Sequence, residues 1–304
     1  MSARNFRSIL ESGWNLGNFV CIGLDSNYER IPNHLFHGGP LATIRGFNCG
    51  IIAKTHDVVC AYKINLAFFL AQGHEGILAL KYTIEYIRAL NPKCLTILDG
   101  KWGDTPETNI QYAKAAFEYF RADAITINPY VGGGMQTFAP FLEYRNKGVF
   151  VLTHTSNPGA DEFQNQQTWL TDDDQMSFFG GDNDEDQERE EWPSIMPLYQ
   201  HVAYRISRHW NKHGNCAVAA SAKHPDALKN VRRIVGNNMP ILVLGVGEQG
   251  AEIKNAVGIG KDNDGRGMII NNGRGIIFAS NGTDFAEAAR HETIKLRDLI
   301  NQHR

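Results

Sequence analysis

The fold of this 304-residue chain is decided by one stretch, Leu95-Thr-Ile-Leu-Asp99-Gly-Lys101-Trp-Gly-Asp104-Thr-Pro-Glu-Thr108. A mostly apolar run is followed by alternating charges, and a helix led by proline comes next. If residues 95–98 form a buried strand, Asp99 and Lys101 lie at its carboxyl end on one face, because side chains two positions apart share a face. Such charges are costly to bury unless they are paired. On these residues alone, a surface salt bridge and a functional site explain the pattern equally well.

The pattern of an apolar run followed by a helix recurs along the chain. Helices are indicated by apolar residues at helical spacing, as in Ile77, Leu80 and Ile84. Strands are predicted at residues 19–25, 58–65, 95–98, 123–130, 148–156, 216–221, 240–245 and 267–271. Helices are predicted at residues 3–16, 40–58, 74–90, 107–121, 135–145, 194–213, 224–236, 249–257 and 283–302.

This alternation of strands and helices predicts an α/β protein whose parallel sheet closes into a (β/α)8 TIM barrel. Residues 1–304 are expected to form a single catalytic domain. An open, doubly wound sheet is the alternative. Strands covered on both faces are apolar throughout in either fold, as in Ile241-Leu-Val-Leu244.

One segment, residues 160–193, breaks the alternation. It is rich in Asp, Glu, Gln, Asn and Gly, and Arg189 is its only basic residue. A solvated, partly disordered acidic loop inserted after the fifth strand is therefore expected. A lid is the alternative, but a lid over an anionic substrate would need basic residues.

Composition excludes several classes of protein. The net charge of −3 gives no sign of nucleic-acid binding or of attraction to membranes. The hydrophobic content of 42% is ample for a large core. The five cysteines are scattered, as in a reduced, cytoplasmic protein. The first residues lack the apolar core of a signal peptide, and no run reaches transmembrane length.

Polar residues gather where the predicted strands end, which is where the active site of such a barrel lies. Charges at successive strand exits favour one shared site over separate salt bridges. The residues are Asp25, Lys63, Asn65, Asp99, Lys101, Asp104, Asn128, Thr155 and Ser156.

Two glycine-rich loops follow the last two strands. Gly245-Val-Gly247-Glu-Gln249-Gly250 matches the dinucleotide fingerprint, but it lies too near the end of the chain for the first strand of a nucleotide-binding half. A phosphate loop is favoured, and Asn271-Asn-Gly273-Arg274-Gly275 supports it. Backbone N–H groups can reach phosphate oxygens there, and Arg274 can bind a phosphate through two parallel hydrogen bonds. An ordinary surface arginine is the alternative.

Together these motifs resemble the orotidine 5'-phosphate decarboxylase family, and the resemblance runs over nearly the whole chain. Asp99-Gly-Lys101-Trp-Gly-Asp104 is similar to the family's Asp-x-Lys-x-x-Asp. Further similar segments are Gly23-Leu-Asp25, Lys63-Ile-Asn65, Thr155-Ser156-Asn-Pro-Gly and the two phosphate loops. The chain departs from the family at Thr105, where isoleucine is usual, and in its long acidic insertion.

The resemblance implies roles for individual residues. The implied catalytic residues are Lys63, Asp99, Lys101 and Asp104, with Lys101 protonating C6 of the substrate. The implied substrate-binding residues are Asp25, Asn65, Thr105, Thr108, Thr155, Ser156, Gly247, Gln249, Gly273 and Arg274.

The resemblance also implies an activity and an assembly. Orotidine 5'-phosphate would be converted to UMP and CO2 in pyrimidine biosynthesis, in the cytoplasm, without cofactor or metal. The enzyme would be a homodimer in which Asp104 and Thr108 reach the partner's site.

Three other interpretations remain open. Relatives that act on sugar phosphates use Mg²⁺, but they would need a carboxylate where this chain has Lys63. A barrel that only binds nucleotide would not need the costly charges. A Schiff-base aldolase could use Lys63 or Lys101, although neighbouring carboxylates hold such a lysine protonated.

Overall fold

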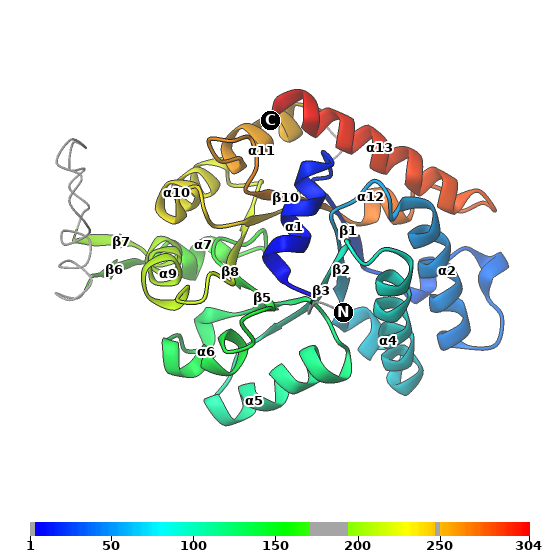
Figure 1. The fold of residues 1–304 in the computed structure, drawn as a ribbon, viewed down its shortest axis with the longest axis horizontal. Coiled ribbons are helices and arrows are strands. Elements are labelled where there is room, and N and C mark those ends of the chain that lie inside the picture. The colour runs from blue at the N-terminus through cyan, green and yellow to red at the C-terminus, as the bar shows by residue number, and fades with distance from the viewer. Residues whose placement is uncertain (1–3, 171–193, 247–249) are drawn as a thin grey trace.

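The computed structural model describes residues 4–170, 194–246 and 250–304. In these ranges, eight parallel strands close into a barrel in the order β1-β10-β9-β8-β5-β4-β3-β2, and helices surround it (Figure 1). The strands are β1 (Val20–Leu24), β2 (Ala61–Asn65), β3 (Leu95–Trp102), β4 (Ala124–Ile127), β5 (Gly148–Leu152), β8 (Cys216–Ser221), β9 (Ile241–Leu244) and β10 (Met268–Asn272). The predicted (β/α)8 barrel is confirmed, and the open doubly wound sheet is excluded.

Most of the predicted helices are present, and several begin at a proline, whose missing N–H is unneeded in a first turn. The longer helices are α1 (Phe6–Asn15), α2 (Pro40–Thr55), α4 (Gly73–Leu90), α5 (Pro106–Lys114), α6 (Met135–Leu142), α9 (Leu198–Arg205), α10 (Pro225–Val235), α11 (Gly250–Gly260) and α13 (Phe285–His303). Three short helices were not predicted, because a single turn shows no periodicity: α3 (Leu66–Leu70), α7 (Ala160–Gln164) and α12 (Arg274–Ile277).

The prediction of one helix over residues 194–213 was wrong at its start. Residues Ile195–Pro197 form strand β7, which pairs antiparallel with β6 (Gln167–Trp169). The residue before a proline is pushed toward extended backbone, so the helix begins only after Pro197. The expected acidic loop therefore opens with α7 and β6, and its remainder, 171–193, lies outside the described residues.

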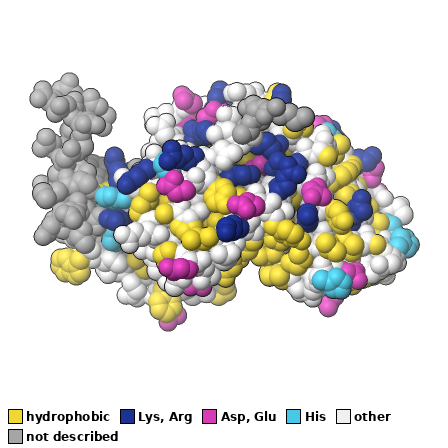
Figure 2. Space-filling model, turned by 60° about the horizontal axis from the view of Figure 1, so that its bottom comes forward, with side chains coloured by type: hydrophobic (Ala, Val, Ile, Leu, Met, Phe, Trp, Pro, Cys, Tyr) yellow, Lys and Arg dark blue, Asp and Glu magenta, His cyan; other side chains and the backbone are white. Residues whose placement is uncertain are grey.

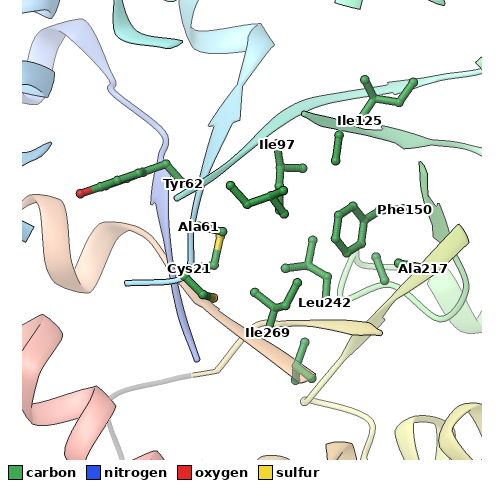
Figure 3. Packing of buried hydrophobic residues seen from close by; sticks show 14 of the residues in the cluster. Cys21, Ala61, Tyr62, Ile97, Ile125, Phe150, Ala217, Leu242 and Ile269 are labelled. Atoms are coloured by element: carbon green, nitrogen blue, oxygen red, sulfur yellow. The ribbon is translucent and has the colours of Figure 1, made fainter. Parts of the chain in front are cut away.

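The barrel interior is filled by side chains from all its strands. Figure 3 shows Ile97, Phe150 and Leu242 pointing toward one another in the middle of the barrel. These side chains are fully buried, as parallel strands covered on both faces require. The interior is thus a solid core, and any site must lie at one of its ends.

Helix α1 lies across the amino-terminal end of the barrel (Figure 1). The ring of Phe6 meets Phe150 edge to face at 5.7 Å between centroids. The indole N–H of Trp14 donates to the carbonyl of Met268 at 2.9 Å, at the first residue of β10. This end is closed by packing, which leaves the carboxyl end for chemistry.

A buried carboxylate, Asp123, anchors the same closed end. Its oxygens accept hydrogen bonds from Arg4 at 2.7 Å, Arg88 at 3.0 Å and the Thr96 hydroxyl at 2.8 Å. Burial by itself would raise the pKa of Asp123, but the hydrogen bonds and charges of Arg4, Lys147 and Arg88 outweigh it and hold the pKa below its usual range. Asp123 is therefore a structural anion that joins the start of the chain to β3 and β4.

The surface carries both signs of charge. In Figure 2, basic side chains gather near the middle of the face, and acidic side chains stand among them. This face is not the uniform basic stripe that nucleic-acid binding requires. Within the described parts of the chain, no helix combines the length and the apolar character needed to cross a membrane.

Replacing Asp123 with Asn should lower the free energy of unfolding by about 3–5 kcal/mol, because it removes the buried anion that several half-buried cations share. Urea-induced unfolding followed by circular dichroism measures this. Asp298→Asn is the matched control. It removes a carboxylate that is 52% exposed and paired with Arg297, so it should change the free energy by less than about 1 kcal/mol. Equal effects of the two substitutions would contradict the structural role.

Candidate active site

A pocket of about 450 Å3 opens at the carboxyl end of the barrel. It is lined from the ends of β1, β2, β3, β5, β8, β9 and β10, so distant parts of the chain meet there. The lining residues are Asp25, Lys63, Asn65, Asp99, Lys101, Leu152, Thr155, Ser156, Asn157, Lys223, Leu244, Gly245, Val246, Asn271, Asn272, Gly273, Arg274 and Gly275. Most of the predicted site residues lie in this one pocket.

A carboxylate between two ammonium groups forms the floor of the pocket. Asp99 Oδ2 lies 2.7 Å from Lys63 Nζ, and Asp99 Oδ1 lies 2.7 Å from Lys101 Nζ. A second carboxylate oxygen, Asp25 Oδ1, lies 3.5 Å from Lys63 Nζ. The side chains of Lys63 and Asp99 are each 5% exposed, whereas that of Lys101 is 44% exposed. Four of the predicted charges, Asp25, Lys63, Asp99 and Lys101, are therefore one connected network, with Lys101 at its accessible edge.

Within this network, Lys63 and Asp99 both keep their charges around neutral pH. Burial alone would raise the pKa of Asp99, but Lys63 and Lys101 hold it well below its usual range. Burial alone would lower the pKa of Lys63, but Asp99 and Asp25 raise it above its usual value. The stabilisation from Asp99 is thus lost only as the pH falls below the usual carboxylate pKa. The stabilisation of the folded state by Lys63 is lost only as the pH rises above the usual lysine pKa.

A bulge in β3 brings Lys101 back over Asp99. Lys101 has φ of 50°, in the left-handed region, and the pairing of β3 with β4 shifts between Leu98 and Trp102. The side chains of Asp99 and Lys101 meet as predicted, but through this bulge and not through the regular alternation of a strand. A left-handed conformation costs a residue with a side chain about 1–2 kcal/mol, so something must hold it.

Thr126 on β4 holds the bulge, and it was not predicted from the sequence. Its hydroxyl oxygen accepts the backbone N–H of Lys101 at 2.9 Å, and the hydroxyl donates to Asp99 Oδ1 at 2.8 Å. One buried hydroxyl therefore fixes both the backbone and the carboxylate of the motif. The available signal was a hydroxyl residue inside the apolar run Ala124–Ile127.

Arg274 and Lys223 also bring positive charge to the lining of the pocket. Neither side chain has a hydrogen-bond or ion-pair partner among the described residues, and both line the pocket. Gly23 and Gly273 let the ends of β1 and β10 approach, since a Cβ on Gly273 would stand 3.1 Å from the carbonyl oxygen of Gly23. Lys223 was missed, although it follows a strand end like the residues that were predicted.

Thr155 and Ser156 also line the pocket. The N–H of Thr155 donates to Gln164 Oε1 at 2.9 Å, and its hydroxyl oxygen accepts from Gln164 Nε2 at 3.2 Å. Helix α7 therefore fixes this wall of the pocket. Asn65 also lines it, while its side-chain oxygen accepts the N–H of Ala67 at 3.3 Å and caps α3.

Several predicted residues do not reach this pocket. Asp104 accepts the N–H of Thr105 at 2.7 Å, and the hydroxyls of Thr105 and Thr108 lie 3.2 Å apart outside it. Asn128 caps the turn at Tyr130. Gly247 and Gln249 lie outside the described residues.

Comparisons with known proteins agree with this geometry. Residues 19–289 match the model of the "Orotidine 5'-phosphate decarboxylase / HUMPS family". An orotidine 5'-phosphate decarboxylase of Cellvibrio japonicus is 39% identical over 298 residues, covering 98% of each chain. One of Aromatoleum aromaticum is 38% identical over 301 residues, covering 99% of this chain and 100% of the relative. The solved structure of Leishmania donovani OMP decarboxylase is 30% identical with a TM-score of 0.73, covering 97% of this chain and 99% of that one.

Replacing Thr126 with Val should lower the free energy of unfolding by about 1–3 kcal/mol, because the partly buried N–H of Lys101 loses its acceptor and the buried Asp99 loses a donor. Thr126→Ser keeps the hydroxyl and should cost less. Denaturant unfolding of both variants measures the difference. If the Val variant were as stable as the Ser variant, the hydroxyl would not be holding the bulge.

Proposed function

This chain belongs to the orotidine 5'-phosphate decarboxylase family. We propose that it converts orotidine 5'-phosphate to UMP and CO2, as a step of pyrimidine biosynthesis in the cytoplasm. The main support is the Lys63–Asp99–Lys101 network, whose two contacts are each 2.7 Å. The reaction needs no cofactor in this proposal, since an ammonium group already stands at the reacting position. Residues 1–304 act as one catalytic domain.

The chemical step depends on Lys101. Breaking the bond between C6 and the carboxylate leaves an electron pair on C6 and releases CO2. The ammonium of Lys101 stands where this negative charge develops and stabilises it. It then donates a proton to C6, and the C–H bond of UMP forms. Because Lys101 is 44% exposed, solvent can return the proton before the next turnover.

The buried partners prepare Lys101 for this role. Asp99 Oδ1 lies 2.7 Å from the Lys101 amine and holds it in place. Asp99 also stands near the substrate carboxylate, and loss of CO2 relieves that crowding. Lys63 balances the second oxygen of Asp99 and orients it, while Asp25 binds the ribose.

The rest of the nucleotide binds along the pocket. Thr155 and Ser156 meet the pyrimidine, and Arg274 binds the phosphate with the glycine-rich backbone around Gly273. Asn65 contributes to the ribose side, and Gly247 and Gln249 are assigned to the second phosphate loop. Binding energy from a phosphate remote from C6 is then available to lower the reaction barrier at C6.

Asp104 and Thr108 complete the site across a homodimer in this proposal. They lie outside the pocket of their own chain, next to the motif that holds Asp99 and Lys101. A carboxylate from a second copy would add to the alternating charges around the substrate, with Thr108 as a further contact. Thr105 would pack beside the base with a single methyl group.

The purified protein should decarboxylate orotidine 5'-phosphate in the presence of EDTA, followed as a change in ultraviolet absorbance. Lys101→Ala should lower kcat by at least about 10³-fold, since it removes both a proton donor and a fixed charge. Lys93→Ala, on an exposed lysine away from the pocket, should leave kcat unchanged. Loss of activity in EDTA would point instead to the Mg²⁺-dependent sugar-phosphate relatives.

Arg274→Ala should lower kcat/KM for the nucleotide at least about tenfold, because a charged hydrogen bond contributes about 1.5–3 kcal/mol. The loss should be far smaller for orotidine, which lacks the phosphate. Steady-state kinetics on both substrates measure the difference, and Arg266→Ala, outside the pocket, is the control. Equal losses on the two substrates would refute the phosphate role.

Asp104→Ala and Lys101→Ala should each be nearly inactive as pure proteins. A re-equilibrated equal mixture should regain about a quarter of wild-type activity, because half of the dimers are mixed and each has one complete site. Mixing the variants and assaying the product tests this. A mixture that stays inactive would place Asp104 in the site of its own chain or outside any site.

A further inference from the structure

Three side chains of metal-binding type gather behind one wall of the pocket. They are His154 at the exit of β5, Asp161 in α7 and His224 just before α10. One ligand atom from each lies within 4.8 Å of the other two. His154 Nε2 lies 3.2 Å from Asp161 Oδ1, and the rings of the two histidines are 4.4 Å apart between centroids.

The environment of His154 is incompletely explained by the protein alone. The residue is 1% exposed, and its Nδ1 has no hydrogen-bond partner among the described residues. The nitrogen that faces Asp161 is the other one, Nε2, so Nε2 is the atom available as a ligand toward Asp161. A second imidazole, that of His224, packs against His154. The contact between Asp161 and His154 does not account for this second ring.

The donor set suits a divalent transition metal. Two imidazoles and one carboxylate, with a position left for water, are a recurring ligand set of zinc. Asp161 is 63% exposed in its side chain, so water can reach the cluster. The carboxylate is already oriented by Asn165, whose Nδ2 donates to Asp161 Oδ1 at 2.8 Å, as outer partners of metal ligands commonly do.

The three ligand atoms need to move only a short distance toward one another to bind one ion. Ligands about 2.0–2.1 Å from a tetrahedral zinc stand about 3.3 Å from one another. The present spread of up to 4.8 Å can contract by rotation of Asp161 and His224, neither of which is fully buried.

We propose that His154, Asp161 and His224 bind one zinc-like divalent ion, which ties α7 to the segment that follows β8. His154 and His224 directly adjoin Thr155 and Lys223, which line the pocket. Gln164 of the same α7 holds Thr155 through two hydrogen bonds. The ion therefore fixes the wall of the pocket and takes no part in the reaction. This site does not rest on the proposed decarboxylase activity.

The test is a calorimetric titration of metal-stripped protein with zinc chloride alone. Wild type should bind one ion with a Kd of micromolar or below, and its melting temperature should rise in excess zinc. Asp161→Asn and His224→Gln should each weaken binding at least about tenfold and abolish the rise. Both positions are exposed or half-buried, so the variants should fold, which circular dichroism checks. His291→Gln is the matched control, on a histidine exposed on α13.

The outcomes separate the possibilities. Single-site binding that is lost in the two cluster variants and kept in the control supports the proposal. Absence of saturable binding, or equal binding by all four proteins, overturns it and identifies any bound zinc as adventitious. Decarboxylation that persists in the stripped protein shows that the ion is structural. An activity that requires zinc would overturn the claim that it takes no part in the reaction.

Discussion

The pairing of one buried carboxylate with two lysines is the constraint on which the rest of the structure depends. Asp99 is almost fully buried, and so is Lys63, and neither charge could be tolerated there without the other. The two side chains meet across neighbouring strands, in a register of β2 against β3 that places Asn65 opposite Asp99. At the bulge of β3, Lys101 adopts the left-handed conformation, and its ammonium meets the carboxylate while it stays open to the pocket.

The barrel separates stability from chemistry by using its two ends differently. At the amino end, α1 closes the barrel by packing, and the ion pairs of Asp123 with Arg4 and Arg88 have only a structural role. At the carboxyl end, the ion pairs of Asp99 with Lys63 and Lys101 lie beside an open pocket. Their charges are therefore placed where a bound substrate can interact with them. Arg274 and Lys223 line this pocket and have no charged partner among the described residues.

The features that depend on strand periodicity and strand ends could be predicted from the sequence. The barrel, and the meeting of Asp25, Lys63, Asp99 and Lys101, are of this kind because parallel strands bring their carboxyl ends to one edge. Thr126 could not be predicted, since its importance comes from a bulge that alternation does not reveal.

The same limit applies to contacts between separate segments. The cluster of His154, Asp161 and His224 joins three segments, so no local spacing marks it. The most direct test of the central claim is a crystal structure of the protein with UMP. The account predicts that Lys101 Nζ lies within about 3.5 Å of C6, on the side where Asp99 lies. A product whose C6 is out of reach of Lys101, or an Asp99 that has left Lys63 and Lys101, would contradict it.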